Sequence, residues 1–488
     1  MLTIDEAQSK QFARRIEQQA KGSAGDPLCT GDHLKAVAEY LCRPLKATPK
    51  SESYRPRVLC PFIWHYELRS RGCLNVKTYN HVAEFERMLE EDPPAYAACL
   101  LFLTGHPTPE WLNALGGELD LDAVYLSEHM AFRPTIFPDT FAFPAMPSAG
   151  RNIIRLTVPI VGQVEPLRTA LPSTDIHSLR QTCSAKLRDK ARVWDSSGQA
   201  GMPVVRRFFL HDTNRFTIEQ DISISLIYEG RRWTLLVWYD AGAGSIGPDL
   251  LLTEITGYER STLVLTPIVQ DARRILAAQS SHGHCPTQPR RNETFGLLAA
   301  QYGKLLVAEL AAQDPFYALT EIFDLVASAE LQFVNMMSQL ITEQIELVGD
   351  DSEHAPKLAD FQHSRELLEQ HMHRLKEMAD LLEKRSNLDW PTASDAEQRV
   401  LTEKARDTLH RQYRYLLERV SALVEKSDKG AELVLNSANL LLAQRSFMYS
   451  QTLGRLTMIG TWVAILYVPL SFLTSIFGMN FREGAARR

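Results

Sequence analysis

Residues 456–477 read LTMIGTWVAILYVPLSFLTSIF, a run without a charged side chain in which eleven residues are Leu, Ile, Val or Phe. A helix of this length extends about 33 Å, enough to cross a hydrocarbon core of about 30 Å. The apolar side chains contribute roughly −5 kcal/mol to insertion, from which Pro469 and the hydroxyl groups subtract. The run therefore predicts a C-terminal transmembrane helix.

The rest of the chain is predicted to be soluble. The whole chain of 488 residues is 45% hydrophobic and carries a net charge of −6. A domain that binds nucleic acid is normally basic, so this charge argues against such a partner. The cysteines are odd in number and irregularly spaced, as expected for reduced thiols in the cytosol. They stand at positions 29, 42, 60, 73, 99, 183 and 285.

The N-terminal residues 1–20 mix acidic and basic side chains without an apolar core, so they do not resemble a signal peptide. We therefore expect the large N-terminal part of the protein to lie in the cytosol, at the plasma membrane or an internal membrane.

The pattern predicts an α+β or α/β cytosolic domain with a mixed sheet, followed by a long antiparallel helical stalk and the membrane helix. Residues 222–228 alternate apolar and polar, and with residues 233–239 they predict a β-hairpin. The predicted segments are residues 1–95 with no assigned role, 96–280 as the α/β domain, 281–313 as linker and helix start, 314–455 as the coiled-coil-like stalk, 456–477 as the membrane helix, and 478–488 as a short tail.

The stalk is predicted to contain three helices. Asp314-Pro315 is an N-cap followed by a first-turn proline and starts the first helix, which Gly349 ends. The second begins near Lys357 and stops before Pro391. The third begins at Ser394-Asp395-Ala396-Glu397, and a continuous helix from there to residue 477 would extend about 125 Å. Its apolar stripe has coiled-coil-like spacing and needs partners: the preceding helices or copies of the chain. The stripe comprises Leu409, Tyr413, Leu416, Val420, Leu423, Val434, Ala438, Leu441 and Met448.

The membrane helix is asymmetric when it is read at seven-residue intervals. One side carries small or hydroxylated residues, and the other rows are bulky. Several copies around an axis could therefore leave room for a hydrated cation, whereas close packing of the small side in a dimer would leave no pore. The candidate pore-lining residues are Thr457, Thr461, Ala464, Val468, Ser471 and Ser475.

Gly478-Met479-Asn480 follows this helix, and the whole run from Leu470 to Phe481 resembles the signature of the CorA magnesium transporter family. Two further stretches, residues 104–112 and 327–333, are similar to the fungal CorA-like branch. The resemblance covers roughly residues 95–481.

This resemblance implies a homopentameric channel that conducts Mg²⁺ or similar divalent cations, with Mg²⁺ also a possible regulatory ligand and no other cofactor. It implies that Asn480 holds hydrated Mg²⁺ at the outer mouth through its water shell, that Gly478 permits a tight backbone, and that Met479 shapes the entrance. Mg²⁺ sheds water reluctantly, so a ring of neutral oxygens is a reasonable site. Alternatively, Asn480 is a helix C-cap.

The chain departs from the family in one respect. The family has a second membrane helix after a short loop, whereas this sequence stops at Arg488. The alternative prediction is therefore a single-span membrane-anchored scaffold or a non-conducting subunit, derived or truncated from a CorA-like protein.

Other motifs are weaker. His282-Gly283-His284-Cys285 has metal-binding residue types but no second ligand pair at zinc spacing, so a loop is the favoured interpretation. His371 and His373 are two positions apart on a helix and cannot share one face. A group of acidic residues lies on the predicted helical hairpin, and a solvated charged surface is favoured for them over a magnesium site. They are Glu343, Glu346, Asp350, Asp351 and Glu353. No nucleotide-binding loop or nucleophile motif is present, so an enzyme is not expected.

Overall fold

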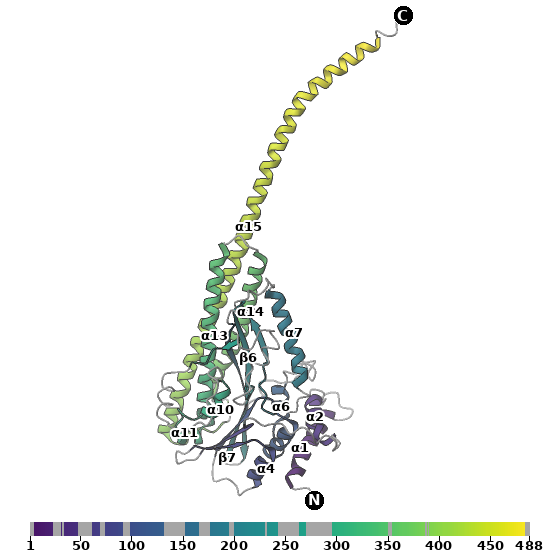
Figure 1. Cartoon of the computed structure of the whole chain (residues 1–488). Coiled ribbons are helices and arrows are strands. Elements are labelled where there is room, and N and C mark those ends of the chain that lie inside the picture. The colour runs from purple at the N-terminus through teal and green to yellow at the C-terminus, as the bar shows by residue number, and fades with distance from the viewer. Residues whose placement is uncertain are drawn as a thin grey trace. The chain divides into compact units, whose positions relative to one another are not determined.

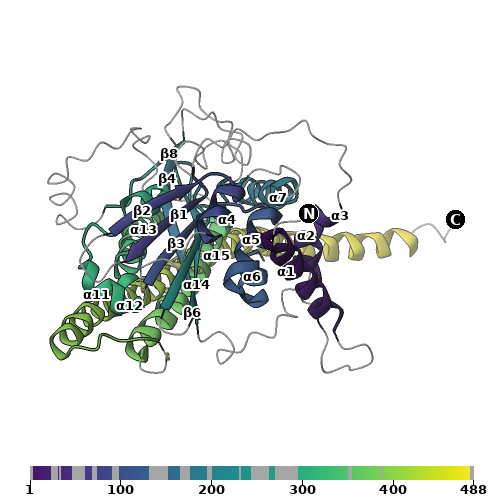
Figure 2. The same ribbon diagram turned by 90° about the horizontal axis from the view of Figure 1, so that it is seen from below.

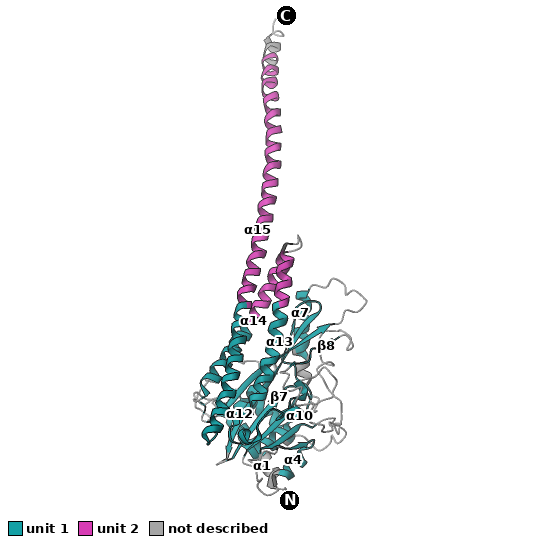
Figure 3. Ribbon diagram, turned by 90° about the vertical axis from the view of Figure 1, so that its left-hand side faces the viewer, with its two compact units in different colours: residues 1–338, 369–422 teal, residues 339–368, 423–488 magenta. Residues whose placement is uncertain are grey.

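The computed structural model (Figure 1) describes residues 4–22, 31, 34–46, 61–68, 74–90, 98–130, 152–164, 176–194, 200–229, 232–242, 263–269, 295–349, 354–385, 388 and 390–483. The chain forms two compact units, coloured separately in Figure 3. Unit 1 comprises residues 1–338 and 369–422, and unit 2 comprises residues 339–368 and 423–488. The described part of unit 2 is helical.

Unit 1 is built on one mixed sheet, which has eight strands within the described residues. The spatial order is β2-β1-β3-β7-β6-β4-β8, with β5 paired to β6. Strands β3 and β7 run parallel, and the other described pairs are antiparallel. The strands are β1 (Ile63–Leu68), β2 (Leu74–Tyr79), β3 (Ala98–Thr104), β4 (Ile153–Val164), β5 (Arg207–Leu210), β6 (Arg215–Glu229), β7 (Arg232–Tyr239) and β8 (Leu263–Leu265).

One face of the sheet is covered by N-terminal helices. Leu101 and Leu103 of β3 and Leu236 and Trp238 of β7 belong to the hydrophobic core on this side. The residues before position 96, to which the sequence assigned no role, supply two of the strands and most of these helices. The helices are α1 (Ile4–Lys21), α2 (Lys35–Leu41), α3 (Arg43–Lys46), α4 (Val82–Glu90), α5 (Pro109–Leu119) and α6 (Ala123–Met130); α7 (Ile176–Trp194) packs near β5.

The alternate residues of the same strands face the C-terminal elements, because successive side chains of a strand point to opposite sides. The Phe102 ring lies 4.9 Å from that of Tyr302, and Tyr239 lies 5.6 Å from Phe295. Figure 2 shows helices on both sides of the strands. The elements on this second face begin with η4 (Phe295–Leu297), α10 (Leu298–Gln301), α11 (Ala308–Gln313) and α12 (Pro315–Ala318).

The predicted hairpin is confirmed as β6 and β7, and β6 begins earlier than predicted, at Arg215. This first half was missed because a polar residue interrupts the apolar row of the strand. Phe216 and Ile218 alternate with Thr217 and Glu219, but Gln220 stands where the alternation requires an apolar residue. Gln220 is nevertheless only 1% exposed, and its amide donates to the Val204 carbonyl at 2.6 Å.

The three predicted stalk helices are confirmed. They are α13 (Thr320–Glu346), which follows α12 and ends in η5 (Leu347–Gly349); α14 (His354–Glu383); and α15 (Ala396–Glu483), which is continuous over 88 residues. Asp314 accepts hydrogen bonds from the amides of Phe316 and Tyr317 at 3.0 and 3.1 Å, so the predicted N-cap is present. Together with the mixed sheet, these helices confirm the predicted fold class.

The apolar stripe of α15 is covered over its first part. Leu409, Tyr413 and Val420 are at most 3% exposed, and the Tyr413 hydroxyl donates to the Phe323 carbonyl of α13 at 3.1 Å. Farther along, Met448 is 63% exposed. The earlier helices therefore cover one part of the stripe, as the sequence predicted, and leave the rest open.

Gly430 of α15 in unit 2 permits close packing of two helices. A Cβ added there would lie closer than 3.0 Å to the ring of Phe361 of α14, which is 1% exposed. The neighbouring Ser427 hydroxyl donates to the Phe361 carbonyl at 2.9 Å and holds the two helices together. Only glycine fits this approach.

We expect Gly430→Ala to destabilise unit 2, although Ala at an open helix position gains about 1 kcal/mol over Gly. Overpacking costs about 1–3 kcal/mol, which exceeds that gain. Urea unfolding of the full chain in detergent micelles measures the effect. Gly454→Ala is the matched control, because nothing lies within 4 Å of its added Cβ. An unchanged or raised urea midpoint for Gly430→Ala would show that the Phe361 ring moves aside for the added methyl group.

Candidate functional site

The candidate site from the sequence lies at the end of α15. Within the described residues, one helix is long and apolar enough to cross a membrane, and none of its apolar window is buried in the structure. That window lies at the C-terminal end of α15, where Leu456 to Phe477 are exposed on every side. A wholly exposed apolar helix needs lipid or other helices around it.

The hydroxyl groups on the small side of this helix bond to the helix itself. Thr461 Oγ1 donates to the Thr457 carbonyl at 2.8 Å, Thr457 Oγ1 donates to the Leu453 carbonyl at 2.8 Å, and Ser471 Oγ donates to the Val468 carbonyl at 2.9 Å. Each hydroxyl proton is thereby satisfied inside the helix, and the oxygen lone pairs remain outward. This side therefore presents hydrogen-bond acceptors, which suit a cation or the protons of its water shell.

Pro469 adds a further acceptor within the same span. Proline has no N–H, so the carbonyl of Ile465, four residues earlier, has no helical donor. In a hydrocarbon environment such a carbonyl needs water, a cation or a neighbouring donor. The middle of the span is therefore more polar than its side chains alone indicate.

The motif Gly478-Met479-Asn480 lies in the helical backbone, since α15 continues to Glu483. The side chains of these three residues lie outside the described part. The alternative interpretation of Asn480 as the residue that caps the helix is wrong in this structure, because the helix runs three residues beyond it.

In the part of the chain that the structure describes, the metal-ligand candidates that precede the apolar run are not brought together. Within the described residues, no group of three or more His, Cys, Asp or Glu could hold a metal ion. The motif at residues 282–285 and the acidic residues Asp350, Asp351 and Glu353 lie outside the described part. His371 is buried whereas the His373 side chain is 75% exposed, so the prediction that they face different ways is confirmed.

The stretch 104–112, which contributed to the resemblance, has a structural role. Gly105 ends β3 with φ of 63°, and a Cβ there would lie closer than 3.0 Å to the Met202 backbone. The Trp238 indole donates to the Gly105 carbonyl at 2.9 Å, and the Tyr40 hydroxyl donates to that of Pro107 at 2.7 Å. These bonds fix the turn between β3 and α5.

A buried polar cluster, which the sequence did not reveal, joins α6 to β6 and β7. His129 Nδ1 lies 2.7 Å from the Ser223 hydroxyl, and its Nε2 lies 3.3 Å from an Asp240 carboxylate oxygen. All three residues are at most 2% exposed, and the imidazole stacks on Trp238 at 3.9 Å. A Ser-His-Asp set so enclosed has no access for a substrate, so it serves to attach α6 to the sheet.

Burial sets the protonation of this cluster. It lowers the pKa of His129 to about 4, and the positive charge of Arg206 acts in the same direction. Burial opposes ionisation of Asp240, but Arg206 and His129 together outweigh it and hold the pKa of that carboxyl below its usual value. Arg206 also pairs with Asp221 at 3.0 Å. His129 is therefore neutral at pH 7, and Arg206 and Asp240 are charged.

The neutral state of His129 predicts loss of stability in acid. The unfolded chain takes up a proton near pH 6.5 that folded His129 accepts only near pH 4, so the free energy of unfolding falls as the pH drops between these values. The loss is about 3 kcal/mol for one such histidine. Burial also lowers the pKa of His65 to about 4, so this residue adds to the loss of stability.

Urea unfolding in micelles from pH 7 to 4 measures how steeply the free energy of unfolding falls with pH. His129→Gln should make this pH dependence less steep, whereas His81→Gln, at an exposed position, should not. Equal pH dependence in the wild type and both variants would refute the assignment of the effect to His129.

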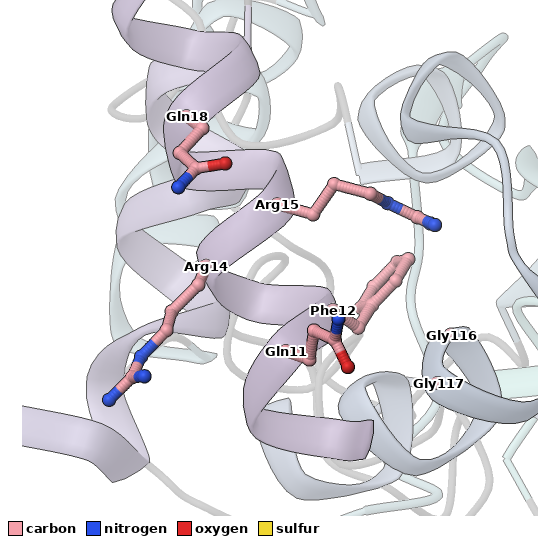
Figure 4. Close-up of a pocket in the computed structure, with 7 residues that line it drawn as sticks. All are labelled: Gln11, Phe12, Arg14, Arg15, Gln18, Gly116 and Gly117. Atoms are coloured by element: carbon pink, nitrogen blue, oxygen red, sulfur yellow. The ribbon is translucent and has the colours of Figure 1, made fainter. Parts of the chain in front are cut away.

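A pocket of about 480 Å³ lies between α1 and α5, lined by Gln11, Phe12, Arg14, Arg15, Gln18, Gly116 and Gly117. In Figure 4, Phe12 and Arg15 extend toward the two glycines, while Arg14 points away. Arg15 is paired with Asp120, and a Cβ on Gly116 would clash with the Phe12 ring. The polar side chains do not converge on one point, so this hollow is the surface of a helix–helix contact.

Comparison with known families singles out the C-terminal part of the chain. Residues 291–484 match the family described as CorA-like Mg2+ transporter protein. The match begins before η4, covers α10 to α15, and ends one residue beyond α15. It therefore includes the candidate membrane helix and Gly478-Met479-Asn480, while the sheet lies outside it. No curated protein matches the chain.

Proposed function

We propose that this protein is a subunit of a membrane transporter for Mg²⁺ or a similar divalent cation. The observation that carries the proposal is the family match over residues 291–484, because it takes in the membrane helix and the motif together. The supporting chemistry is the side of α15 that presents hydroxyl oxygens with their protons already bonded to the helix. The large N-terminal part would lie in the cytosol.

In this proposal several copies of α15, five by family resemblance, surround an axis with their small side inward. Thr457, Thr461 and Ala464 line one part of the path, and Val468, Ser471 and Ser475 line the next. Side chains this short leave width for a hydrated ion, which suits Mg²⁺ because its water is costly to remove. The bulky rows face lipid or neighbouring helices.

Asn480 is proposed as the selective residue at the mouth of the path. A ring of side-chain amide oxygens would accept hydrogen bonds from the water around Mg²⁺ without a direct metal bond. Gly478 and Met479 shape this entrance. Cytosolic Mg²⁺ is proposed as a regulatory ligand as well as the transported ion.

The test is Mg²⁺ flux into liposomes that contain the purified full chain and a Mg²⁺-sensitive dye. Flux that requires the protein and saturates with external Mg²⁺ is the expected result. Normal insertion into the bilayer without flux would contradict the proposal and favour the second candidate, a single-span anchored scaffold or non-conducting subunit. The second candidate also accounts for the part of the apolar stripe of α15 near Met448 that is left exposed, because a scaffold could bind its partners there.

A further inference from the structure

Three elements of unit 1 meet at one buried histidine. His371 of α14 is 0% exposed, and its Nδ1 lies 2.8 Å from a Glu330 carboxylate oxygen of α13. Its Nε2 lies 3.2 Å from a carboxylate oxygen of Glu219 on β6. Both glutamates are buried, at 3% and 1% exposure. The phenyl ring of Phe333 stacks on the imidazole at 3.9 Å.

This geometry favours a protonated imidazole, because Nδ1 is hydrogen-bonded to Glu330 and Nε2 lies within ion-pair distance of Glu219, although it makes no hydrogen bond there. A neutral imidazole has one N–H and one lone pair, so it can donate to only one of two carboxylates. The lone pair would then face the oxygen of the second carboxylate. The imidazolium leaves no lone pair against a carboxylate oxygen, and its charge stabilises two carboxylates that are otherwise costly to bury.

The charges around His371 come from every element packed against it. Arg374 of α14 lies 2.7 Å from Glu219, and Arg207 of β5 lies 3.4 Å from the same carboxylate. Further titratable neighbours are His211, whose ring lies 6.3 Å from that of Phe333, and Tyr413 of α15, which interacts with Glu330. Asp221 of β6 interacts with Glu219 and Arg374. Glu219 thus has arginine partners besides His371, so loss of the imidazole charge acts chiefly on Glu330.

We propose that the cluster of His371, Glu219 and Glu330 is a pH-sensitive clamp, which holds α14 on α13 and the sheet while the imidazole carries its proton and loosens when alkaline pH removes it. The clamp lies near the point where α13 and α14 pass from unit 1 to unit 2, at residues 338 and 369. Glu330 and Phe333 also lie in the stretch 327–333, which is similar in sequence to the fungal CorA-like branch. The inference does not depend on transport.

The direction of the pH effect follows from the charges. Burial disfavours the imidazolium, but Glu330 and Glu219 outweigh it and raise the pKa of His371 above its usual value of 6.5. A raised pKa in the folded state means that the stabilisation is complete below pH 6.5 and is lost as the pH rises through the folded-state pKa. His371, Arg374 and Arg207 hold the pKa of Glu219 at about 2, against the effect of burial, so that carboxylate stays ionised throughout.

Hydrogen–deuterium exchange of the full chain in detergent micelles tests the clamp. Protection of the α14 amides around residues 365–380 is measured from pH 6 to 10 and corrected for the intrinsic pH dependence of exchange. We expect protection to fall about tenfold as His371 deprotonates, because the neutral imidazole gives up its charge-assisted interaction with a carboxylate. His371→Gln should show the lower protection at every pH. His373→Gln, on the exposed side of the same helix, should match the wild type.

A second variant keeps the test decisive if His371→Gln fails to fold. Glu330→Gln replaces the carboxylate by an amide, which can donate to the lone pair of a neutral imidazole. Its α14 should therefore stay protected to pH 10. Wild-type protection that does not change between pH 6 and 10 would overturn the clamp, as would an unaltered pH profile in Glu330→Gln or in a folded His371→Gln protein.

Discussion

Asn480→Ala is expected to reduce Mg²⁺ flux in liposomes to the level of protein-free vesicles. The substitution removes the amide oxygens that the proposed ring offers to the water shell of the ion. Alanine is also smaller, so the loss would come from missing hydrogen bonds and not from a blocked path. Dye-reported flux, normalised to the amount of inserted protein, measures the effect.

Asn439→Ala is the matched control, because Asn439 is an exposed asparagine on the same helix before the apolar run. It should leave flux unchanged. Flux retained by Asn480→Ala at the wild-type rate would remove Asn480 from the proposed site. Flux lost equally in both variants would point to damage to α15 as a whole.

Asp314→Ala is expected to cause the largest loss of stability, about 3–5 kcal/mol, because it breaks a buried ion pair. Asp314 is 0% exposed and pairs with Arg385, which follows α14 and lies over the Phe316 ring at 4.8 Å. The same carboxylate caps α12. Its removal leaves a buried guanidinium without this partner and two amides without their acceptor. Urea unfolding of the full chain in micelles gives the change.

Asp407→Ala provides the comparison, since Asp407 is exposed and pairs with the adjacent Arg406 at 2.9 Å. Exposed pairs contribute about 0–1 kcal/mol, so this midpoint should hardly move. Asp314→Asn separates charge from capping, because the amide oxygen still accepts from the helix. A loss below about 1 kcal/mol in Asp314→Ala would mean that Arg385 finds water or another acceptor.

Local signals in the sequence were sufficient for the stalk helices and for the β6–β7 hairpin. Asp314-Pro315 set the start of α12, and the absence of proline between Pro391 and Pro469 allowed one long helix, which the structure shows as α15 with Pro469 inside it. The alternation in residues 222–228 found the second half of β6. These features depend on neighbours within a few residues, which a single sequence displays.

Partners that are distant in the chain could not be predicted. Nothing local marks Glu219 as buried beside His371, because the two are brought together by the packing of α14 on β6. The same holds for Asp240 with His129, and for Arg385 with Asp314. The sequence identified Asp314 as a cap, but its second role as an ion-pair partner depends on where α14 ends.

The asymmetric membrane helix is the centre of the functional account, and the reactivity of single cysteines with a charged thiol reagent in liposomes tests it most directly. Positions 461, 468 and 475 lie on the small side, while 459, 466 and 473 lie on the opposite side at 100° per residue. The account predicts that cysteines in the first row react, that external Mg²⁺ slows them, and that those in the second row do not. Equal protection of both rows, or reaction confined to the second, would contradict a cation path along the small side of α15.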